Sequence, residues 1–348
     1  MSRLAALAAL AVLAGCLPSS QKQNSRAVSP ADSASTALAA TVPVDSLTLA
    51  WSAAAPADDP MPVPSSMAWL GDALAVVETQ EGSIRRFRDG AYLDRTDLEA
   101  ESFPYAAGAR GDSLVVLARG RNEIQWVVPG EGVARRVPAP ASANAALAMG
   151  GGVYVRVGGG PDTLAPAVLR LDASGLEVAR VALPGAAWRS VGFLRAWGDS
   201  ILALSGYRPV VDVVRGGRVL EVDTLALVGF ASPQLPRSAQ FQRGEVTEPP
   251  LLSSSAAAVG DRLFVLNLRT DHVRVDVYGR DGRLERVLAS RRVRGPETVF
   301  ALDVAVRAVG DGGLEVAVLF SRPPGLMRSP DSRVDVYRWR AGGLEDVR

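Results

Sequence analysis

The chain contains very few of the residue types that build reactive or crosslinked sites. Its 348 residues include one cysteine, one histidine and one lysine, and its 38 basic residues nearly balance its 37 acidic residues. A single cysteine cannot form an intramolecular disulfide bond or a cysteine-based metal cluster. A net charge of +1 provides no global field that would attract nucleic acid, so we expect no nucleic-acid partner. The fold must therefore be stabilised by its hydrophobic core.

The single cysteine ends a short apolar run near the N-terminus. Arg3 supplies positive charge, residues 4–13 are apolar, and Leu13-Ala14-Gly15-Cys16 follows, which is the layout of a secretory signal. The run is much shorter than the roughly 20 apolar residues that a transmembrane helix needs. The last four residues resemble a bacterial lipobox. The resemblance implies a signal peptide over 1–15 and a membrane anchor through a lipidated Cys16; ordinary cleavage without a lipid is the alternative.

The segment over residues 16–43 is expected to be a flexible tether. After the cysteine it consists mainly of Ser, Ala, Pro, Gln and Asn, and such a composition cannot bury enough apolar surface to offset the entropy of ordering. A flexible chain of this length has a root-mean-square reach of about 30 Å. We therefore expect it to hold a domain over residues 44–348 clear of the lipid headgroups.

Short glycine-containing turns divide that domain into six similar units. Each turn is Gly-Asp or Gly-Gly and precedes a short apolar strand, for example Ala73–Val77 or Leu263–Leu266. These turns begin at Gly71, Gly111, Gly151, Gly198, Gly260 and Gly310, and second turns are closed by Gly90, Gly132, Gly175, Gly217, Gly282 and Gly343. Gly and Asp accept the positive φ of tight hairpins, and the β-branched segments between them suit half-buried strands. Each unit therefore predicts about four antiparallel strands.

The repeat predicts an all-β fold, a six-bladed β-propeller of four-stranded antiparallel blades. A single four-stranded sheet cannot bury both faces, so units of about 40–50 residues pack side by side around an axis. A pair of β-sandwiches would lack the regular pair of glycine turns, and a parallel β-helix would have far shorter rungs. The predicted blades span roughly 60–100, 101–140, 141–186, 187–230, 251–294 and 295–348.

Two units carry a resemblance to known propeller repeats. Asp172–Val178 and Arg280–Glu285 resemble the later half of NHL-type and TolB-like six-bladed propeller repeats. The resemblance covers residues 60–348 and concerns architecture rather than one activity. No unit carries the WD dipeptide or the kelch pattern of double glycine plus aromatic, which disfavours those two families.

Two further segments bear on how the ring closes and where it binds. Residues 47–51, which alternate like a strand, are expected to pair at the outer edge of blade six, either next to residues 344–347 or instead of them. The sequence leaves this choice open.

Residues 231–250 hold four prolines and little apolar content. They predict a surface loop, the only insertion large enough to shape a binding mouth.

The expected innermost strands are poor in catalytic and metal-binding groups. Propeller hydrolases and lactonases, with which this predicted fold invites comparison, hold a metal in the central channel with Asp, Asn, Glu or His. Here only Asn144 and Asp303 are available, whereas calcium takes six or more oxygen ligands, so we expect no metal and no cofactor. His272 beside Asp271 suits a Ser-His-Asp relay, but no serine lies in a G-x-S-x-G elbow. We therefore predict no catalytic residue.

Arginines recur at the position where the second strand of a unit should end. They are Arg119, Arg208, Arg269 and, when its unit is counted from Gly312, Arg322. Equivalent turns share one face of the disc, so these residues, together with Gln80, Asp271 and His272, predict a ligand-binding face suited to anions. The alternative is that they are ordinary solvated arginines, because arginine is frequent in this chain.

The sequence therefore predicts a membrane-anchored, extracytoplasmic propeller of the bacterial cell envelope. We expect it to act as a binding or scaffold protein for a protein, a glycan or an anionic ligand. The alternative is an extracytoplasmic hydrolase or lactonase of the propeller type. The small number of carboxylates on the expected inner strands favours binding.

Overall fold

The computed structural model describes residues 30–158, 165–184, 191–216, 219–269, 272–290, 300–310, 312–321 and 332–340. Within these ranges most of the regular secondary structure is β-strand, and two short helices are also present. No helix in the described ranges is long and apolar enough to cross a membrane.

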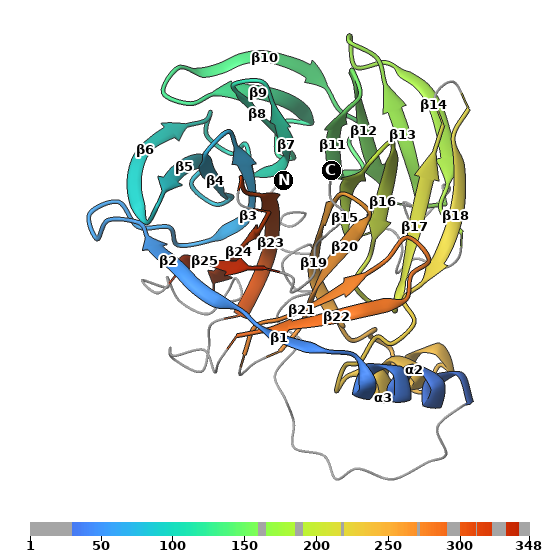
Figure 1. Ribbon diagram of the computed structural model, residues 1–348. Helices are drawn as coiled ribbons and strands as arrows, with labels where there is room; N and C mark the ends of the chain where they lie inside the picture. Colours follow the sequence, from blue (N-terminus) through green and yellow to red (C-terminus); the bar gives the residue numbers. More distant parts are fainter. Residues whose placement is uncertain are drawn as a thin grey trace.

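Six sheets surround a central axis and confirm the predicted six-bladed propeller (Figure 1). Within each blade, consecutive strands pair antiparallel. The first strand of each blade is innermost, because it contacts the first strands of both neighbouring blades.

The strands follow the chain from blade one to blade six. Blade one contains β3 (Pro64–Leu70), β4 (Ala73–Glu78), β5 (Ser83–Arg88) and β6 (Ala91–Asp97), and blade two contains β7 (Pro104–Arg110), β8 (Ser113–Ala118), β9 (Glu123–Val128) and β10 (Gly132–Pro138). Blade three contains β11 (Ala143–Met149), β12 (Gly152–Val157), β13 (Ala167–Leu171) and β14 (Glu177–Ala182), and blade four contains β15 (Phe193–Trp197), β16 (Ser200–Leu204), β17 (Val210–Arg215) and β18 (Glu221–Ala226). Blade five contains β19 (Ser253–Val259), β20 (Arg262–Asn267), β21 (Arg274–Tyr278) and β22 (Leu284–Ala289), and blade six contains β23 (Phe300–Ala308), β24 (Leu314–Ser321) and β25 (Arg333–Trp339).

The glycine turns and apolar runs explain this arrangement. Gly71 and Gly111 have φ values of 60° and 61°, a left-handed conformation that side chains disfavour, and each connects the first two strands of its blade. The strands that follow, β4 and β8, are buried along their whole length. Because neighbouring blades cover both faces of each second strand, these strands consist of continuous rather than alternating apolar residues.

The N-terminal segment completes the ring. Strand β2 (Thr48–Ala54) pairs antiparallel with β25, from Thr48 opposite Arg338 to Ala54 opposite Arg333. Blade six therefore has three C-terminal strands and one N-terminal strand. β2 pairs with β25 directly and so takes the place of a fourth strand; residues 344–347, the other candidate, lie outside the described residues. Just before it, β1 (Val44–Ser46) pairs parallel with β22 and adds a fifth strand to blade five.

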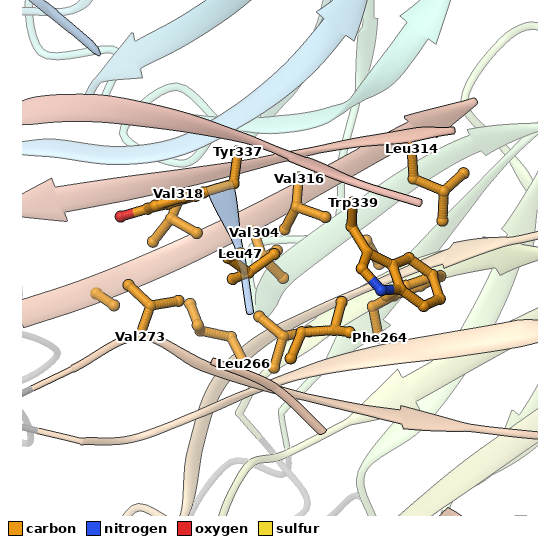
Figure 2. Close-up of a cluster of buried hydrophobic side chains, with 14 of the residues drawn as sticks. Leu47, Phe264, Leu266, Val273, Val304, Leu314, Val316, Val318, Tyr337 and Trp339 are labelled. Carbon is orange, nitrogen blue, oxygen red and sulfur yellow. The ribbon is translucent and has the colours of Figure 1, made fainter. Parts of the chain in front are cut away.

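Leu47, between β1 and β2, fixes this segment in the core. It is 7% exposed and belongs to a cluster that joins blades five and six. Figure 2 shows Leu47 between side chains of blade five, such as Phe264 and Leu266, and side chains of blade six, such as Val316. Burying an aliphatic side chain of this size contributes about 1.5–3 kcal/mol, which adds to the pairing of β1 with β22 and of β2 with β25.

Two helices lie outside the blades, beside each other in Figure 1. Helix α2 (Pro30–Thr41) forms within the segment for which the sequence predicted a flexible tether, because Leu38, Ala39 and Val42 pack against the apolar cluster of blades four and five. Helix α3 (Leu235–Gln242) lies in the 231–250 insertion, and its Leu235 packs against the same cluster. The insertion is thus partly helical rather than a loop throughout.

Candidate functional site

The six innermost strands bring one carboxylate to the central channel. Among β3, β7, β11, β15, β19 and β23, only Asp303 of β23 carries an acidic side chain, and that side chain is 4% exposed. It follows a β-bulge between Ala301 and Asp303, an irregularity that redirects a side chain. Asn144, the other candidate ligand, lies half-buried at the corresponding bulge of β11.

Asp303 accepts hydrogen bonds from four groups that belong to four blades. Its Oδ2 accepts the backbone N–H of Met67 in blade one at 2.8 Å. Its Oδ1 accepts the Ser255 hydroxyl of blade five, the backbone N–H of Val304 at 3.0 Å, and Arg195 Nη2 of blade four at 3.0 Å. The carboxylate is therefore neutralised and its lone pairs are used by the chain itself.

Arg195 was not among the residues that the sequence singled out. The structure places the inner strand of blade four, β15, at Phe193–Trp197, and this brings Arg195 into the channel wall. A basic residue in an otherwise apolar segment that ends in a Gly-Asp turn was the available signal.

The channel does not fit a metal of the kind that its fold invites. Calcium takes six to eight oxygen ligands, whereas the inner strands offer one carboxylate that already bonds an arginine. No group of three or more His, Cys, Asp or Glu side chains comes together in the described ranges. The Arg195 guanidinium is paired with the one inner-strand carboxylate, so that carboxylate is not open for coordination.

The predicted ligand-face residues lie at the ends of second strands. Gln80 follows β4, Arg119 follows β8, Arg208 follows β16, and Arg269 and His272 follow β20. Because the second strands of all blades run in the same direction along the axis, the positions after them share one face of the disc. Asp271, Arg322 and the lipidation candidate Cys16 lie outside the described residues. The partial basic ring stays a prediction, because only three of its four arginines lie within the described residues.

Two of these arginines are held by local contacts. The Arg119 guanidinium carbon lies 5.4 Å from the centre of the Tyr105 ring, a cation–π distance. Arg269 Nη2 donates to the carbonyl oxygen of Ala231 at 2.7 Å. The second contact shows that the 231–250 insertion borders this face, as does the hydrogen bond from Ser238 to the carbonyl oxygen of Tyr207 at 3.3 Å.

A buried carboxylate shapes the same face at blade one. Glu78, fully buried at the end of β4, accepts the backbone N–H groups of Val63 at 3.0 Å and Gln80 at 3.2 Å, and also that of Glu81. Burial raises the pKa of Glu78, although these backbone hydrogen bonds act in the opposite direction. These bonds join the loop after β4 to the segment before β3, so Glu78 acts as an internal brace rather than as an available acid.

Comparison with known proteins supports the fold alone. No protein-family model matches the chain, and no curated protein sequence matches it. Among solved structures, a gluconolactonase from Xanthomonas campestris is 13% identical, with 84% of this chain and 87% of that chain covered and a TM-score of 0.50. A calcium-binding protein, regucalcin, from Agrobacterium tumefaciens is 10% identical, with 86% and 97% covered and a TM-score of 0.50.

Proposed function

We propose that this protein is a membrane-anchored, extracytoplasmic binding propeller that presents one face of its disc to a protein, a glycan or an anionic ligand. The observation that carries the proposal is the state of Asp303. The one inner-strand carboxylate is bonded to Arg195, Ser255 and two backbone N–H groups, so the channel supports ring integrity rather than catalysis.

The binding surface of the proposal is the face at the ends of the second strands. Rigid strands hold its loops, while the loops themselves are free to vary in length and composition. It carries Arg119 and Arg208, and the 231–250 insertion borders it. Arginine forks form two parallel hydrogen bonds with carboxylate, sulfate or phosphate, which gives this face a preference for acidic partners.

The lipid anchor of the proposal starts at Cys16. Helix α2 begins at Pro30 and packs against blades four and five, which leaves the residues between 16 and 30 as the tether. Fully extended, a segment of this length spans at most about 50 Å. The propeller would then stay close to the membrane, with the rim of blades four and five toward its anchor.

A charge-reversal experiment tests the binding face. Arg119→Glu combined with Arg208→Glu should reduce, in mass spectrometry of detergent-solubilised membranes, the proteins or glycans that co-purify with the chain. Both side chains are half-buried, so each substitution should cost about 0.5–3 kcal/mol of unfolding free energy, and a circular dichroism spectrum should show that the variant is still folded. Arg269 is left intact because it also holds the insertion.

The matched control reverses two arginines on the opposite face. Arg88 and Arg215 are the last residues of the third strands of blades one and four, and their side chains are 46% and 58% exposed. The Arg88→Glu and Arg215→Glu pair should co-purify the same partners as the wild type. Equal co-purification by both double variants would contradict the binding face, and metal-dependent turnover of a lactone panel by the wild type would favour the lactonase alternative.

A further inference from the structure

The Arg195 guanidinium lies in a cage of oxygen acceptors from three blades. Its Nε donates to the Ala256 carbonyl oxygen at 2.8 Å and its Nη1 to the Leu194 carbonyl oxygen at 3.0 Å. Its Nη2 donates to Asp303 Oδ1 at 3.0 Å and to the Ser255 hydroxyl at 3.4 Å. All three nitrogens of the planar group are thus bonded, as a rigid fork of five N–H donors permits.

The cage also matches the charge of its occupant. The Asp303 side chain is 4% exposed and the Arg195 side chain 22% exposed, so both charges are largely withdrawn from water. A buried charge persists only when it is paired and its hydrogen bonds are satisfied. The Phe193 ring, whose centre lies 5.1 Å from the guanidinium carbon, adds an aromatic face that attracts a cation.

We infer that these groups form a binding site for one planar guanidinium cation, which the chain fills with its own Arg195 side chain. The acceptors come from blade four itself, blade five and blade six, and the same carboxylate accepts the backbone N–H of Met67 in blade one. The occupied site therefore connects four of the six blades across the channel. One of the four is blade six, the blade that the N-terminal strand β2 completes.

The site should remain when its occupant is removed. Arg195→Ala leaves the acceptors in place and a space that free guanidinium fits, and it leaves Asp303 buried without its counter-charge. Losing one partner of a buried ion pair should lower the Tm of the full chain by roughly 5–15 °C. Low-millimolar guanidinium chloride, with sodium chloride as the ionic-strength match, should restore part of that loss with a saturating dependence on concentration.

Three controls separate refilling of the site from a general salt effect. Wild type should not gain Tm from guanidinium, since its site is occupied. Arg195→Lys keeps a positive charge without the planar fork and should be only partly destabilised. Arg195→Ala combined with Asp303→Asn removes the carboxylate and should lose the guanidinium response.

Two outcomes would overturn the inference. One is a Tm of Arg195→Ala within about 2 °C of wild type. The other is a guanidinium response no larger in Arg195→Ala than in wild type or in the double variant. If Arg195→Ala does not fold on expression, it is refolded from urea by dilution with and without guanidinium chloride; a higher yield with guanidinium supports the site, and equal yields reject it.

Discussion

An acid-sensitive ion cluster should hold the connection between the closing strand and blade one. Asp59 lies in the segment between β2 and β3. Its carboxylate accepts a hydrogen bond from Arg85 Nη2 at 2.5 Å, one from the Tyr92 hydroxyl at 2.8 Å, and one from Arg95. The Arg85 side chain is fully buried and that of Asp59 is 22% exposed. The cluster therefore fixes the crossover from blade six to blade one.

The size of the effect follows from the pKa of Asp59. Burial alone would raise this pKa, but the hydrogen bonds from Arg85, Tyr92 and Arg95 outweigh burial and lower it from 3.8 to about 2. A lowered pKa in the folded state means that the carboxylate stabilises the fold above pH 3.8 and that this contribution disappears as the pH falls through 2. The difference corresponds to about 2 kcal/mol at pH 7 and to roughly half of that at pH 3.

Asp59→Asn tests this reasoning by urea unfolding at both pH values. At pH 7 the variant should lose about 2 kcal/mol or more of unfolding free energy, because Arg85 also loses its carboxylate partner. Between pH 7 and pH 3 its deficit relative to wild type should shrink by about 1 kcal/mol. Asp58→Asn, at the exposed neighbouring position, is the matched control and should stay within about 0.5 kcal/mol of wild type. A deficit that is the same at pH 3 and pH 7 would refute the assignment.

Two further predictions concern the N-terminal part of the chain. Cys16→Ser should release the protein from the membrane fraction or leave its precursor unprocessed, and unchanged detergent partitioning would refute lipidation. Deleting residues 44–54 should lower the Tm sharply and promote aggregation, because it removes β1, Leu47 and β2 and exposes the edge of β25. Deleting residues 17–29 should leave the Tm unchanged, and equal Tm values for the two deletions would argue against closure by β2.

The turns and the strands beside them could be predicted because they are local features. A Gly-Asp pair followed by a β-branched run specifies a hairpin without reference to the rest of the chain. Repeating it six times then determines the architecture, since each sheet needs neighbours to bury both of its faces. The register of β4 with β3 and β5 illustrates this: the turns at Gly71 and near Gln80 and Glu81 set it.

Helix α2 could not be predicted from its own composition. Its sequence, PADSASTALAAT, contains one large apolar residue, Leu38, and a helix of this length is marginal in water even when it is rich in alanine. What stabilises it is packing: Leu38, Ala39 and Val42 meet the cluster of blades four and five, and Ser35 Oγ accepts the backbone N–H of Gly229 at 2.8 Å. These partners lie about two hundred residues away, beyond the range of local pattern.

The Arg195–Asp303 pair was missed for a related reason, and its position has a functional consequence. Whether an arginine points into the channel or between blades depends on strand register, since a shift of one residue exchanges the two faces of a strand. In blade four that register is set by the start of β15 at Phe193, and in blade six by the bulge before Asp303.

Once the register brings these two side chains together across the channel, the inner wall no longer offers a free carboxylate. Sequence change in the inner strands is then limited by the ion pair. On the proposed function, new binding properties would arise in the loops after the second strands and in the 231–250 insertion, where a substitution alters the surface without breaking the ring.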